Sequence, residues 1–554
     1  MISLKKYKKG RKVDSEIIIK IKEHLVHIIS ETNGVSLADS LELLSHTQAL
    51  KEDSQLKSLL TEYRGLITDY HLKKSTISEV LEHPFSKAFF QFFKEFPIPF
   101  HEEHIHLTGS LSAEFIYPRL KALLEGPESE VYSEKIKEVY GDDALPIESI
   151  EDLDQLLRLK EGEQFKTYLK ILYIPKLVLN SKQAHRDAAY HMAKELYQKY
   201  NVGHIRLKFT LSRSTKMGGE QVPGLEDLTE EDVVFGLYEG FKDFKREYSF
   251  FDFILSPSFR KEASFFDAEN YGSKKEHFMD QIFKLLDILE RHPYLRDNLK
   301  EIDTVGDEKD LYKKTHFEEM RNGLRRLQYN GFSIRSHHGE TWTILRRGIQ
   351  SVDNAMNIWH IDTLEHGLSL GINPNFYFHR LFQRVMQKNR KGEALVKTEQ
   401  EYLELADMEW HDTAVKEKLI QGTPITSLEE TSFLKTKFHY AREIEHYQHD
   451  VLNRMINKKV SLVALPSSNL KLTGVFPEFK DHPFSWWEKK GVSLGVGTDN
   501  YITLSTNYIQ EMLILLLSDP DNLKITKLLM LTTREKRRPY ISHLLWEMRK
   551  NLFN

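Results

Sequence analysis

Two histidines that stand one residue apart are the first residues of this sequence that could do chemistry. His104 and His106 flank Ile105 in the segment HEEHIHLTGS. On a β-strand, successive side chains alternate between the two faces, so both imidazoles would point to one side and the isoleucine to the other. Such a pair can chelate a metal ion, but two surface histidines on an edge strand would give the same pattern. The pair alone leaves both interpretations open.

Three further segments end in groups that suit a metal site or a proton transfer. His337 and Glu340 stand in SHHGET, His366 in IWHIDTLEHG, and Asp499 follows small residues in VSLGVGTDN. A carboxylate at the tip of an apolar strand is costly unless it is paired, hydrogen-bonded or bound to a cation. Because four predicted strands each end in such a group, we favour one joint site over four unrelated surface residues.

Three imidazole nitrogens and one carboxylate oxygen form a ligand set that suits zinc. Zinc accepts both ligand types, and its catalytic sites keep a position for a water whose pKa falls toward neutrality. The chain has no cysteine, which excludes the Cys-ligated zinc deaminases that act on flipped bases and the disulfide-stapled secreted modules. A joint site of this kind would hold one zinc ion per chain.

The elements that would position these residues alternate between short apolar strands and long helices from about residue 97 onward. Parallel βα units produce this alternation, and eight of them predict an α/β fold of the (β/α)₈ TIM-barrel type, with its chemistry at the carboxyl ends of the strands. The predicted strands are Glu103–Leu107, His204–Thr210, Phe251–Ser256, Glu301–Val305, Gly331–His337, Ile358–Glu365, Val460–Pro466 and Val492–Thr498.

The remaining parts of the chain are predicted to be helical additions. Ile17–Ile29, for example, has apolar residues at helical spacing. Additions of this size can mediate self-association, so a homo-oligomer is among the expected states. We expect an N-terminal helical segment over residues 1–96, a barrel over 97–520 with helical insertions near 117–202 and 371–459, and C-terminal helices over 521–554 that pack on the barrel.

Composition and charge exclude several other classes of protein. The 554 residues include 78 Lys and Arg against 82 Asp and Glu, so the chain lacks the positive excess that sequence-independent binding to nucleic acid needs. The apolar stretch Met512–Leu517 is far shorter than the ~20 residues that span a bilayer. The basic N-terminus is followed by charged residues instead of an apolar signal segment. We therefore expect a cytoplasmic protein with neither a nucleic-acid nor a membrane partner.

The order of the motifs resembles the adenosine/AMP deaminase family of metal-dependent amidohydrolases. The match extends over about residues 97–515 and comprises six motifs in sequence order. His104-Ile105-His106-Leu107 with Gly109 is similar to the family's His-x-His-Leu-x-Gly, and Glu301 to Glu308 is similar to its Gly-bearing fourth-strand motif. His337-His338-Gly339-Glu340 is similar to His-Ala-Gly-Glu, Glu365-His366-Gly367 to Gly-His-Gly, Leu465-Pro466-Ser467-Ser468-Asn469 to the Pro-x-Ser-Asn turn, and Gly497-Thr498-Asp499-Asn500 to Thr-Asp-Asp.

The resemblance implies a role for each matching residue. His104, His106, His337 and Asp499 would bind the zinc ion, and Asp499 would also hold the metal-bound water. His366 would orient and deprotonate that water, and Glu340 would protonate the purine ring nitrogen beside the amine-bearing carbon. Gly306 would contact the pyrimidine-ring nitrogen of the purine through its backbone. The reaction would be addition of hydroxide to an aromatic carbon, followed by loss of ammonia.

Two departures from the family pattern bear on the substrate. The family's Asp-Asp pair is Asp499-Asn500 here, and an amide always carries donors, so Asn500 is expected to keep the hydrogen bond that the second aspartate gives to the purine's imidazole ring. Thr108 stands where nucleoside-specific members carry an aspartate that meets the ribose 5′-hydroxyl. A hydroxyl tolerates a 5′-phosphate that a carboxylate would repel. In this respect the chain resembles the branch that acts on nucleoside monophosphates, including methyl-AMP deaminases.

Two basic segments are candidates for contacts with a phosphate. Arg213 and Lys216 lie in the loop after the second predicted strand, at the mouth end of the barrel. A solvated basic loop fits these two residues equally well. Arg260 and Lys261, after the third predicted strand, are the second choice.

These observations predict zinc-dependent hydrolytic deamination of an adenine nucleotide or nucleoside to the inosine form, with AMP- or dAMP-type substrates favoured over adenosine. Hydrolysis of another ring or amide substrate is a first alternative, against which the purine-recognition motif at Gly306 argues. The second alternative is a nucleotide-sensing or assembly subunit of an antiviral defence system that alters purine nucleotide pools. It rests on a resemblance to bacterial adenosine-deaminase-like proteins with enlarged helical additions. The presence of His366 and Glu340 argues against a subunit that only binds.

Overall fold

Eight strands form one sheet whose spatial order is the order of the strands in the sequence. Neighbouring strands from β2 to β8 pair in parallel. The computed structural model describes residues 15–32, 34–160, 162–163, 165–211, 225, 227–309 and 311–553. The strands are β1 (Phe100–His106), β2 (Val202–Thr210), β3 (Asp252–Arg260), β4 (Glu301–Val305), β5 (Ser333–His338), β6 (Thr363–His366), β7 (Ser461–Ala464) and β8 (Leu494–Val496).

The sheet closes between its first and last strands, which makes it a (β/α)₈ barrel. Ile105 and Asp499 form a parallel bridge. The His106 amide donates to the Asp499 carbonyl at 2.8 Å, and the Asp499 amide donates to the His104 carbonyl at 2.9 Å. The closure therefore places two of the predicted metal ligands of β1 directly beside Asp499. The predicted fold class is confirmed.

Small residues in β8 and directly after it allow this closure. A Cβ atom on Gly497 would lie 2.7 Å from the His104 Cβ, and one on Gly495 would lie 2.8 Å from the Glu103 Cγ. Real Cβ atoms do not approach other carbons so closely, so a larger residue at either position would push β8 away from β1. The run of small residues before Asp499 is thus a packing requirement of the site.

The predicted start of the sixth strand was wrong. Ile358 and Trp359 were assigned to the sixth strand, but they belong to a π-helical turn, Ala355–Trp359, and β6 begins at Thr363. Trp359 is buried, and its indole N–H donates to the carbonyl oxygen of Phe317 at 2.7 Å. A short apolar run does not distinguish a strand from a buried helical turn, and here packing against the helix that contains Phe317 decided the outcome.

Contacts between residues divide the chain into two compact units, which are described separately. The first contains the chain up to His101 together with Glu195–Gly203 and Asn507–Asn554, and the second contains Glu102–Lys194 and His204–Thr506. The predicted domain boundaries at residues 96 and 520 stay predictions.

In the first unit, α1 packs against α6 and α25. The predicted helix over Ile17–Ile29 lies within α1, whose apolar residues at helical spacing are buried. The helices of this unit are α1 (Ser15–Glu31), α2 (Leu37–Ser45), α3 (Gln48–Glu52), α4 (Ser54–His71), α5 (Ile77–Glu82), α6 (Pro84–Lys94), α23 (Tyr508–Ser518), α24 (Ile525–Thr532) and α25 (Ile541–Phe553).

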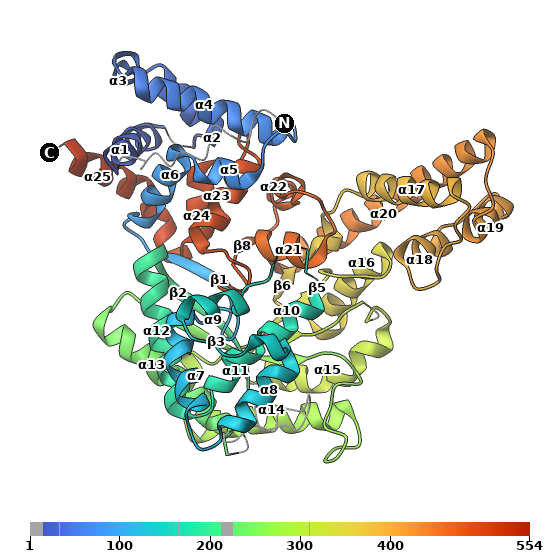
Figure 1. The fold of residues 1–554 in the computed structure, drawn as a ribbon, viewed down its shortest axis with the longest axis horizontal. Coiled ribbons are helices and arrows are strands. Elements are labelled where there is room, and N and C mark those ends of the chain that lie inside the picture. Colours follow the sequence, from blue (N-terminus) through green and yellow to red (C-terminus); the bar gives the residue numbers. More distant parts are fainter. Residues whose placement is uncertain are drawn as a thin grey trace. The chain divides into compact units, whose positions relative to one another are not determined.

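The second unit contains most of the barrel, the first predicted helical insertion up to Lys194, and the whole of the second insertion. The first insertion runs from α7 to α12, between β1 and β2. The second runs from α17 to α20, between β6 and β7, and projects from the barrel as an arm (Figure 1). Its helices are α7 (Ala113–Leu124), α8 (Ser129–Tyr140), α9 (Ile150–Leu157), α10 (Phe165–Ile171), α11 (Tyr173–Val178), α12 (Lys182–Tyr200), α13 (Glu230–Glu247), α14 (Lys274–Arg291), α15 (Lys314–Tyr329), α16 (Leu345–Asn354), α17 (Pro374–Arg390), α18 (Gln400–Asp407), α19 (Thr413–Gln421), α20 (Ser427–Asn457), α21 (Pro466–Thr473) and α22 (Phe484–Lys489).

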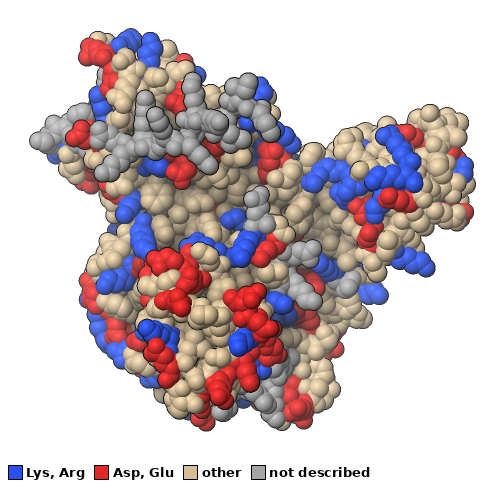
Figure 2. All heavy atoms as spheres, viewed as in Figure 1, with Lys and Arg blue, Asp and Glu red and all other residues tan. Residues whose placement is uncertain are grey.

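The surface is charged but mixed in sign. On the face that Figure 2 shows, acidic and basic side chains lie next to one another over the barrel and over the arm, as expected from nearly equal numbers of the two charges. Among the helices that the structure describes, none has the length and apolar composition needed to cross a bilayer.

Replacement of Gly497 by alanine tests the closure of the barrel. The added methyl group overlaps the Cβ of His104, and such overpacking costs about 1–3 kcal/mol of unfolding free energy. We expect this loss in chemical denaturation, together with weaker metal binding. Gly65→Ala is the matched control, because a Cβ there meets nothing within 4 Å. Unchanged stability of Gly497→Ala would contradict the account of β8.

Candidate active site

The carboxyl ends of β1, β5, β6 and β8 bring the predicted ligands together. The Nε2 atoms of His104 and His106 are 3.1 Å apart, and Asp499 Oδ1 lies 3.8 Å from the first and 3.5 Å from the second. Tetrahedral zinc with bonds of 2.0–2.1 Å separates its ligand atoms by about 3.3 Å. The three atoms are therefore spaced as three corners of such a site, and the residues fit the metal that their types suggest.

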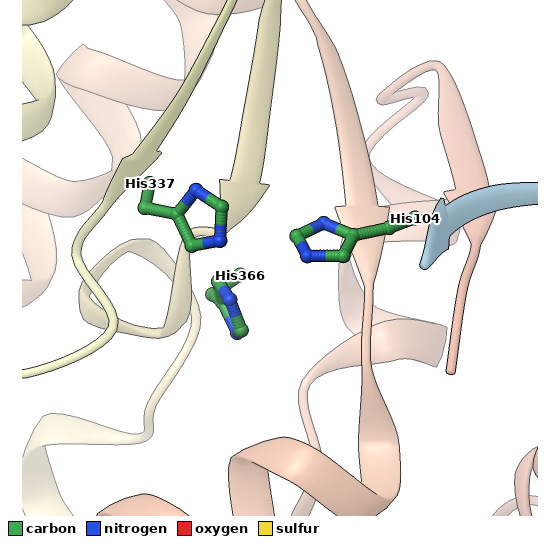
Figure 3. A group of neighbouring side chains, drawn as sticks. All are labelled: His104, His337 and His366. Carbon is green, nitrogen blue, oxygen red and sulfur yellow. The ribbon is translucent and has the colours of Figure 1, made fainter. Parts of the chain in front are cut away.

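His337 and His366 complete this group. Potential ligand atoms of His104, His337 and His366 lie within 4.8 Å of one another, as do those of His106, Asp303 and His337. Figure 3 shows the rings of His104, His337 and His366 converging on one space from three strands. The two imidazoles of β1 lie on one side of the strand, as the alternation predicted, and they belong to one site instead of an exposed strand edge.

Two buried carboxylates orient the imidazoles. Glu365 Oε2 lies 2.8 Å from His104 Nδ1, and Asp303 Oδ1 lies 3.1 Å from His337 Nδ1. A carboxylate at Nδ1 fixes the proton there and leaves Nε2 as the lone pair that faces a metal. Both rings are thus held in the tautomer that a metal ligand requires.

A buried lysine joins the two carboxylates. Lys208 Nζ lies 2.9 Å from Glu365 Oε1 and 3.0 Å from Asp303 Oδ2, and all three side chains are fully buried. Arg335 Nε adds a second cation, 2.6 Å from Glu365 Oε1. Burial alone would raise the pKa of Glu365, but Arg335 and Lys208 outweigh it and hold that pKa well below its usual range. Both carboxylates therefore stay ionised beneath the imidazoles.

Asp499 is held by neighbours from two motifs. Ser468, in α21, donates to its Oδ2 at 2.5 Å, and the Asn500 amide donates to its Oδ1 at 2.5 Å. Burial raises its pKa to about 6. Asp499 and His366 have φ angles of 67° and 66°, in the left-handed region that residues other than glycine seldom adopt. Two of the predicted site residues are thus placed by an uncommon backbone conformation.

A relay of hydrogen bonds sets the tautomer of His366. The backbone N–H of Phe484 donates to His482 Nδ1 at 3.2 Å, so neutral His482 carries its proton on Nε2, 3.1 Å from Asn469 Oδ1. The Asn469 amide then donates to His366 Nδ1 at 2.8 Å. Burial lowers the pKa of His366 well below its usual value, and its proton therefore lies on Nε2. In this state His366 can donate a hydrogen bond to an oxygen in the site. Its predicted role as the base stays a prediction.

Glu340 stands on a loop that another carboxylate holds. Glu308 accepts the backbone N–H groups of Gly339, Glu340 and Thr341 at 2.8, 2.6 and 2.7 Å. Only 13% of the Glu340 side chain is exposed, and burial raises its pKa to about 8. A carboxyl group with this pKa is largely protonated at neutral pH, so it can serve as a proton donor.

The helical arm also contacts this loop. The Leu345 amide donates to Glu404 Oε1 at 2.8 Å, and the hydroxyl of Tyr377 donates to the same oxygen at 2.6 Å. The indole N–H of Trp342, two residues after Glu340, donates to the Tyr377 hydroxyl at 3.2 Å. The second insertion therefore packs on the segment that carries the candidate acid.

One cavity of about 920 Å³ contains most of the predicted site. Gly306 has a φ of 109°, and a Cβ there would lie 2.1 Å from a Glu262 oxygen, so only glycine fits at this point of the wall. The predicted residues that line the cavity are His106, Thr108, Gly306, His337, Glu340, His366 and Asp499.

The remaining residues that were predicted to contact the substrate differ in where they lie. Asn500 is fully buried and is not among the described residues that line the cavity. Arg213 and Lys216 fall outside the described residues. Arg260 lines the cavity, with its guanidinium paired to Glu262. The Lys261 ammonium donates to the His337 carbonyl instead.

Sequence reasoning missed five residues that shape the site. Asp303 and Glu308 stand inside a quoted motif, and Glu365 replaces the first glycine of another, so their positions were visible but their partners were not. Lys208 had a weaker signal, as a lysine inside an apolar strand. Tyr168 had none, because it comes from a helix of the first insertion, α10. The missed residues are Tyr168, Lys208, Asp303, Glu308 and Glu365.

Comparisons with known proteins found similar solved structures. No family model matches the sequence, and no curated protein matches it. The structure is similar to the apo N6-methyl-AMP deaminase from Arabidopsis thaliana, with 11% identity, 83% of this chain and 98% of that chain covered, and a TM-score of 0.47. It is also similar to an ADAL–IMP complex, with 12% identity, 83% and 99% covered and a TM-score of 0.48.

A zinc-bound amidohydrolase from Burkholderia ambifaria is a third similar structure. It has 13% identity and a TM-score of 0.41, with 82% of this chain and 93% of that chain covered.

Replacement of Glu365 by glutamine tests the carboxylate behind His104. The amide no longer fixes the proton on Nδ1, and loss of such a partner typically weakens metal affinity about 10- to 100-fold. Competition with a chelator measures this change. Glu103→Gln is the matched control, since Glu103 belongs to the same charge cluster but pairs with Arg206 and Arg335. A zinc affinity of Glu365→Gln equal to that of the wild type would refute the assignment.

Proposed function

We propose that this protein is a zinc-dependent deaminase that hydrolyses the amino group of an adenine nucleotide or nucleoside. The observation that carries the proposal is the position of Glu340. A carboxyl group that stays protonated near neutral pH lines the same cavity as a set of histidine and aspartate ligands. Hydrolysis of an aromatic amine needs an acid for the ring nitrogen and an activated water for the adjacent carbon.

The metal would be held by His104, His106, His337 and Asp499. When bound, zinc supplies a Lewis acid and lowers the pKa of a water toward neutrality. Glu365 and Asp303 support this assignment, because carboxylates behind metal-binding imidazoles are the usual outer partners of such sites. The charges below the site are compensated by Lys208 and Arg335.

Each of the other site residues would have one task. Glu340 gives its proton to the ring nitrogen, so that electrons from the attacked ring carbon are accepted there. His366 directs the attacking oxygen by donation from Nε2. Asp499 holds the same oxygen, accepts one proton of the water and passes it to the departing amine, and the second proton of the water restores Glu340 when ammonia leaves. Gly306 lines the cavity without a side chain of its own, so the edge of the ring can approach its backbone.

The size of the cavity favours a nucleotide over a nucleoside. About 920 Å³ exceeds the volume of a bare nucleoside and lies near the upper end of ligand sites. Thr108 contributes a hydroxyl at the position predicted for contact with a 5′-substituent. Besides Lys208, the basic side chains that line the cavity are Lys176, Arg260, Lys309 and Lys471. We therefore propose AMP or dAMP as the preferred type of substrate, with Arg213 and Lys216 as further phosphate contacts.

Replacement of Glu340 by glutamine should abolish turnover and leave zinc binding intact. The amide keeps the shape of the side chain but has no acidic proton to give. In the wild type, activity should fall as the pH rises through about 8, because only the protonated form of Glu340 donates. Ammonia release across a pH series, with zinc content of the same samples, measures both effects. Near-normal turnover of Glu340→Gln would remove the assigned acid.

Thr108→Asp tests the preference for a phosphate. We expect wild-type protein to release ammonia faster from AMP or dAMP than from adenosine. The introduced carboxylate would repel the phosphate and lower kcat/KM for the monophosphates on the order of 10- to 100-fold, with little change for adenosine.

The same substrate panel separates the two functions. A wild type that prefers adenosine would contradict the phosphate assignment. Nucleotide binding without any ammonia release would instead favour the sensing or assembly subunit.

A further inference from the structure

Glu102 is a buried residue that lies across the seam of the barrel, the contact between β1 and residues 494–499. It belongs to β1 and is fully buried. Its Oε1 accepts the backbone N–H of His104 at 3.1 Å and the backbone N–H of Thr498 at 3.1 Å. These two residues stand on opposite sides of the seam. One oxygen atom therefore ties the strand that carries His104 to the segment that leads into Asp499.

The second oxygen of Glu102 holds two hydroxyl groups that follow β8. Oε2 lies 2.8 Å from the Thr498 hydroxyl and 3.0 Å from the Tyr501 hydroxyl. A carboxyl group can engage about four partners through its two oxygens, and these four hydrogen bonds fill that capacity. The side chain is thus fixed from both sides of the seam.

The strands themselves join at the seam over a short length. β8 has three residues, and after it a single bridge pairs Ile105 with Asp499. Gly497 allows the close approach of the two backbones, because a Cβ there would lie 2.7 Å from the Cβ of His104. A glycine has no side chain with which to hold a neighbour in place. A side chain that bonds to both backbones can supply this support, and Glu102 is placed to do so.

The bonds from Glu102 also bear on the backbone of Asp499. Asp499 has a φ of 67°, and such a conformation persists only where the surroundings determine it. Glu102 fixes the preceding residue, Thr498, through its N–H and its hydroxyl, and it contacts Tyr501 on the other side of Asp499. The turn is therefore held on both sides of the predicted ligand.

We infer that Glu102 is a positioning residue of the metal site, which holds the seam so that His104, His106 and Asp499 can share one ion. Their potential ligand atoms lie within 4.8 Å of one another, and functional sites tolerate displacements of only about 0.5 Å. The inference rests on the zinc assignment in the proposed function. It adds a residue that acts on the backbone beside the ligands, whereas Glu365 acts on the ring of His104.

Two substitutions of Glu102 test the inference. Leucine is similar in size but removes all four hydrogen bonds. Glutamine keeps an oxygen for the two N–H groups, and its amide can donate to the two hydroxyls. We expect Glu102→Leu to bind zinc about 10- to 100-fold more weakly than the wild type and Glu102→Gln to stay within about threefold. Competition with a chelator measures the affinities of the full-length proteins.

Cobalt in place of zinc separates a positioning role from a role in stability alone. The visible absorption of Co²⁺ depends on the arrangement of its ligands. We expect an altered cobalt spectrum for Glu102→Leu and a spectrum like that of the wild type for Glu102→Gln. If folded Glu102→Leu has the zinc affinity and the cobalt spectrum of the wild type, and only its unfolding temperature falls, the inference is overturned.

Glu404→Leu is the matched control. Glu404 is also a fully buried carboxyl group, and it accepts hydrogen bonds from the Leu345 amide and the Tyr377 hydroxyl, both outside the seam. Its replacement should lower the unfolding temperature and leave zinc affinity and the cobalt spectrum unchanged. Weaker zinc binding by this variant as well, to the same degree, would overturn the specific role of Glu102.

A milder variant decides the question if Glu102→Leu does not fold. Thr498→Val keeps the shape of the side chain and removes one hydrogen bond to Glu102. We expect zinc affinity to fall about two- to tenfold, and an unchanged affinity would overturn the inference.

These measurements do not depend on deamination. If the wild type binds zinc but releases no ammonia from any adenine compound, the proposed function fails, and the affinities of the Glu102 variants still decide on the positioning role. If the wild type releases ammonia and Glu102→Leu binds zinc as tightly as the wild type does, the inference fails and the proposed function stands.

Discussion

The ion pairs between Lys208 and the two carboxylates beneath the histidines are the interaction on which the site depends. Glu365 and Asp303 each hold the Nδ1 of a different imidazole, and one ammonium group lies within 3.0 Å of both. Two buried carboxylates would repel each other without a cation, and removal of one partner from a buried charge pair costs about 3–5 kcal/mol. The lysine thus makes it possible to place two acidic groups where the imidazoles need them. The two imidazoles are therefore oriented by carboxylates whose charges the buried lysine compensates.

The proposed chemistry needs one protonated carboxyl group beside these ionised ones, and the structure separates them by environment. Asp303 and Glu365 face cations, which keep their pKa values low. For Glu340, burial outweighs its charged neighbours and raises its pKa to about 8. Glu308 accepts a hydrogen bond from the backbone N–H of Glu340. The helical arm holds the end of the same loop, because Glu404 accepts hydrogen bonds from the Leu345 amide and from the Tyr377 hydroxyl. The two helical insertions therefore serve the site in different ways: the first supplies Tyr168 to the cavity, and the second supports the loop of the candidate acid.

Much of the barrel was predictable because its pattern is local. A strand that alternates two histidines with an isoleucine, or one that ends in small residues before Asp499, shows its character within a few positions. Each of the eight predicted strands overlaps an observed strand, and β4 has the predicted bounds. The wrong start of the sixth strand, at Ile358, arose where an apolar pair fits a strand and a buried helical turn equally well. The predicted ligands could be named from their types, and the barrel closure then brought ligand atoms of His104, His106 and Asp499 to within 4.8 Å of one another.

Sequence by itself determined the fold class, the order of the chemical groups and the absence of cysteine chemistry, because these depend on residue type and short spacing. Tertiary structure alone decided which groups touch. Glu365 reaches His104 across 261 positions, and Asn500 reaches Tyr168 across 332. The physical reason is that hydrogen bonds and desolvation act over a few ångströms in space, whatever the separation along the chain. Asn500, which its motif predicts to be a purine contact, therefore donates its amide protons to Asp499 and Tyr168 in the folded molecule.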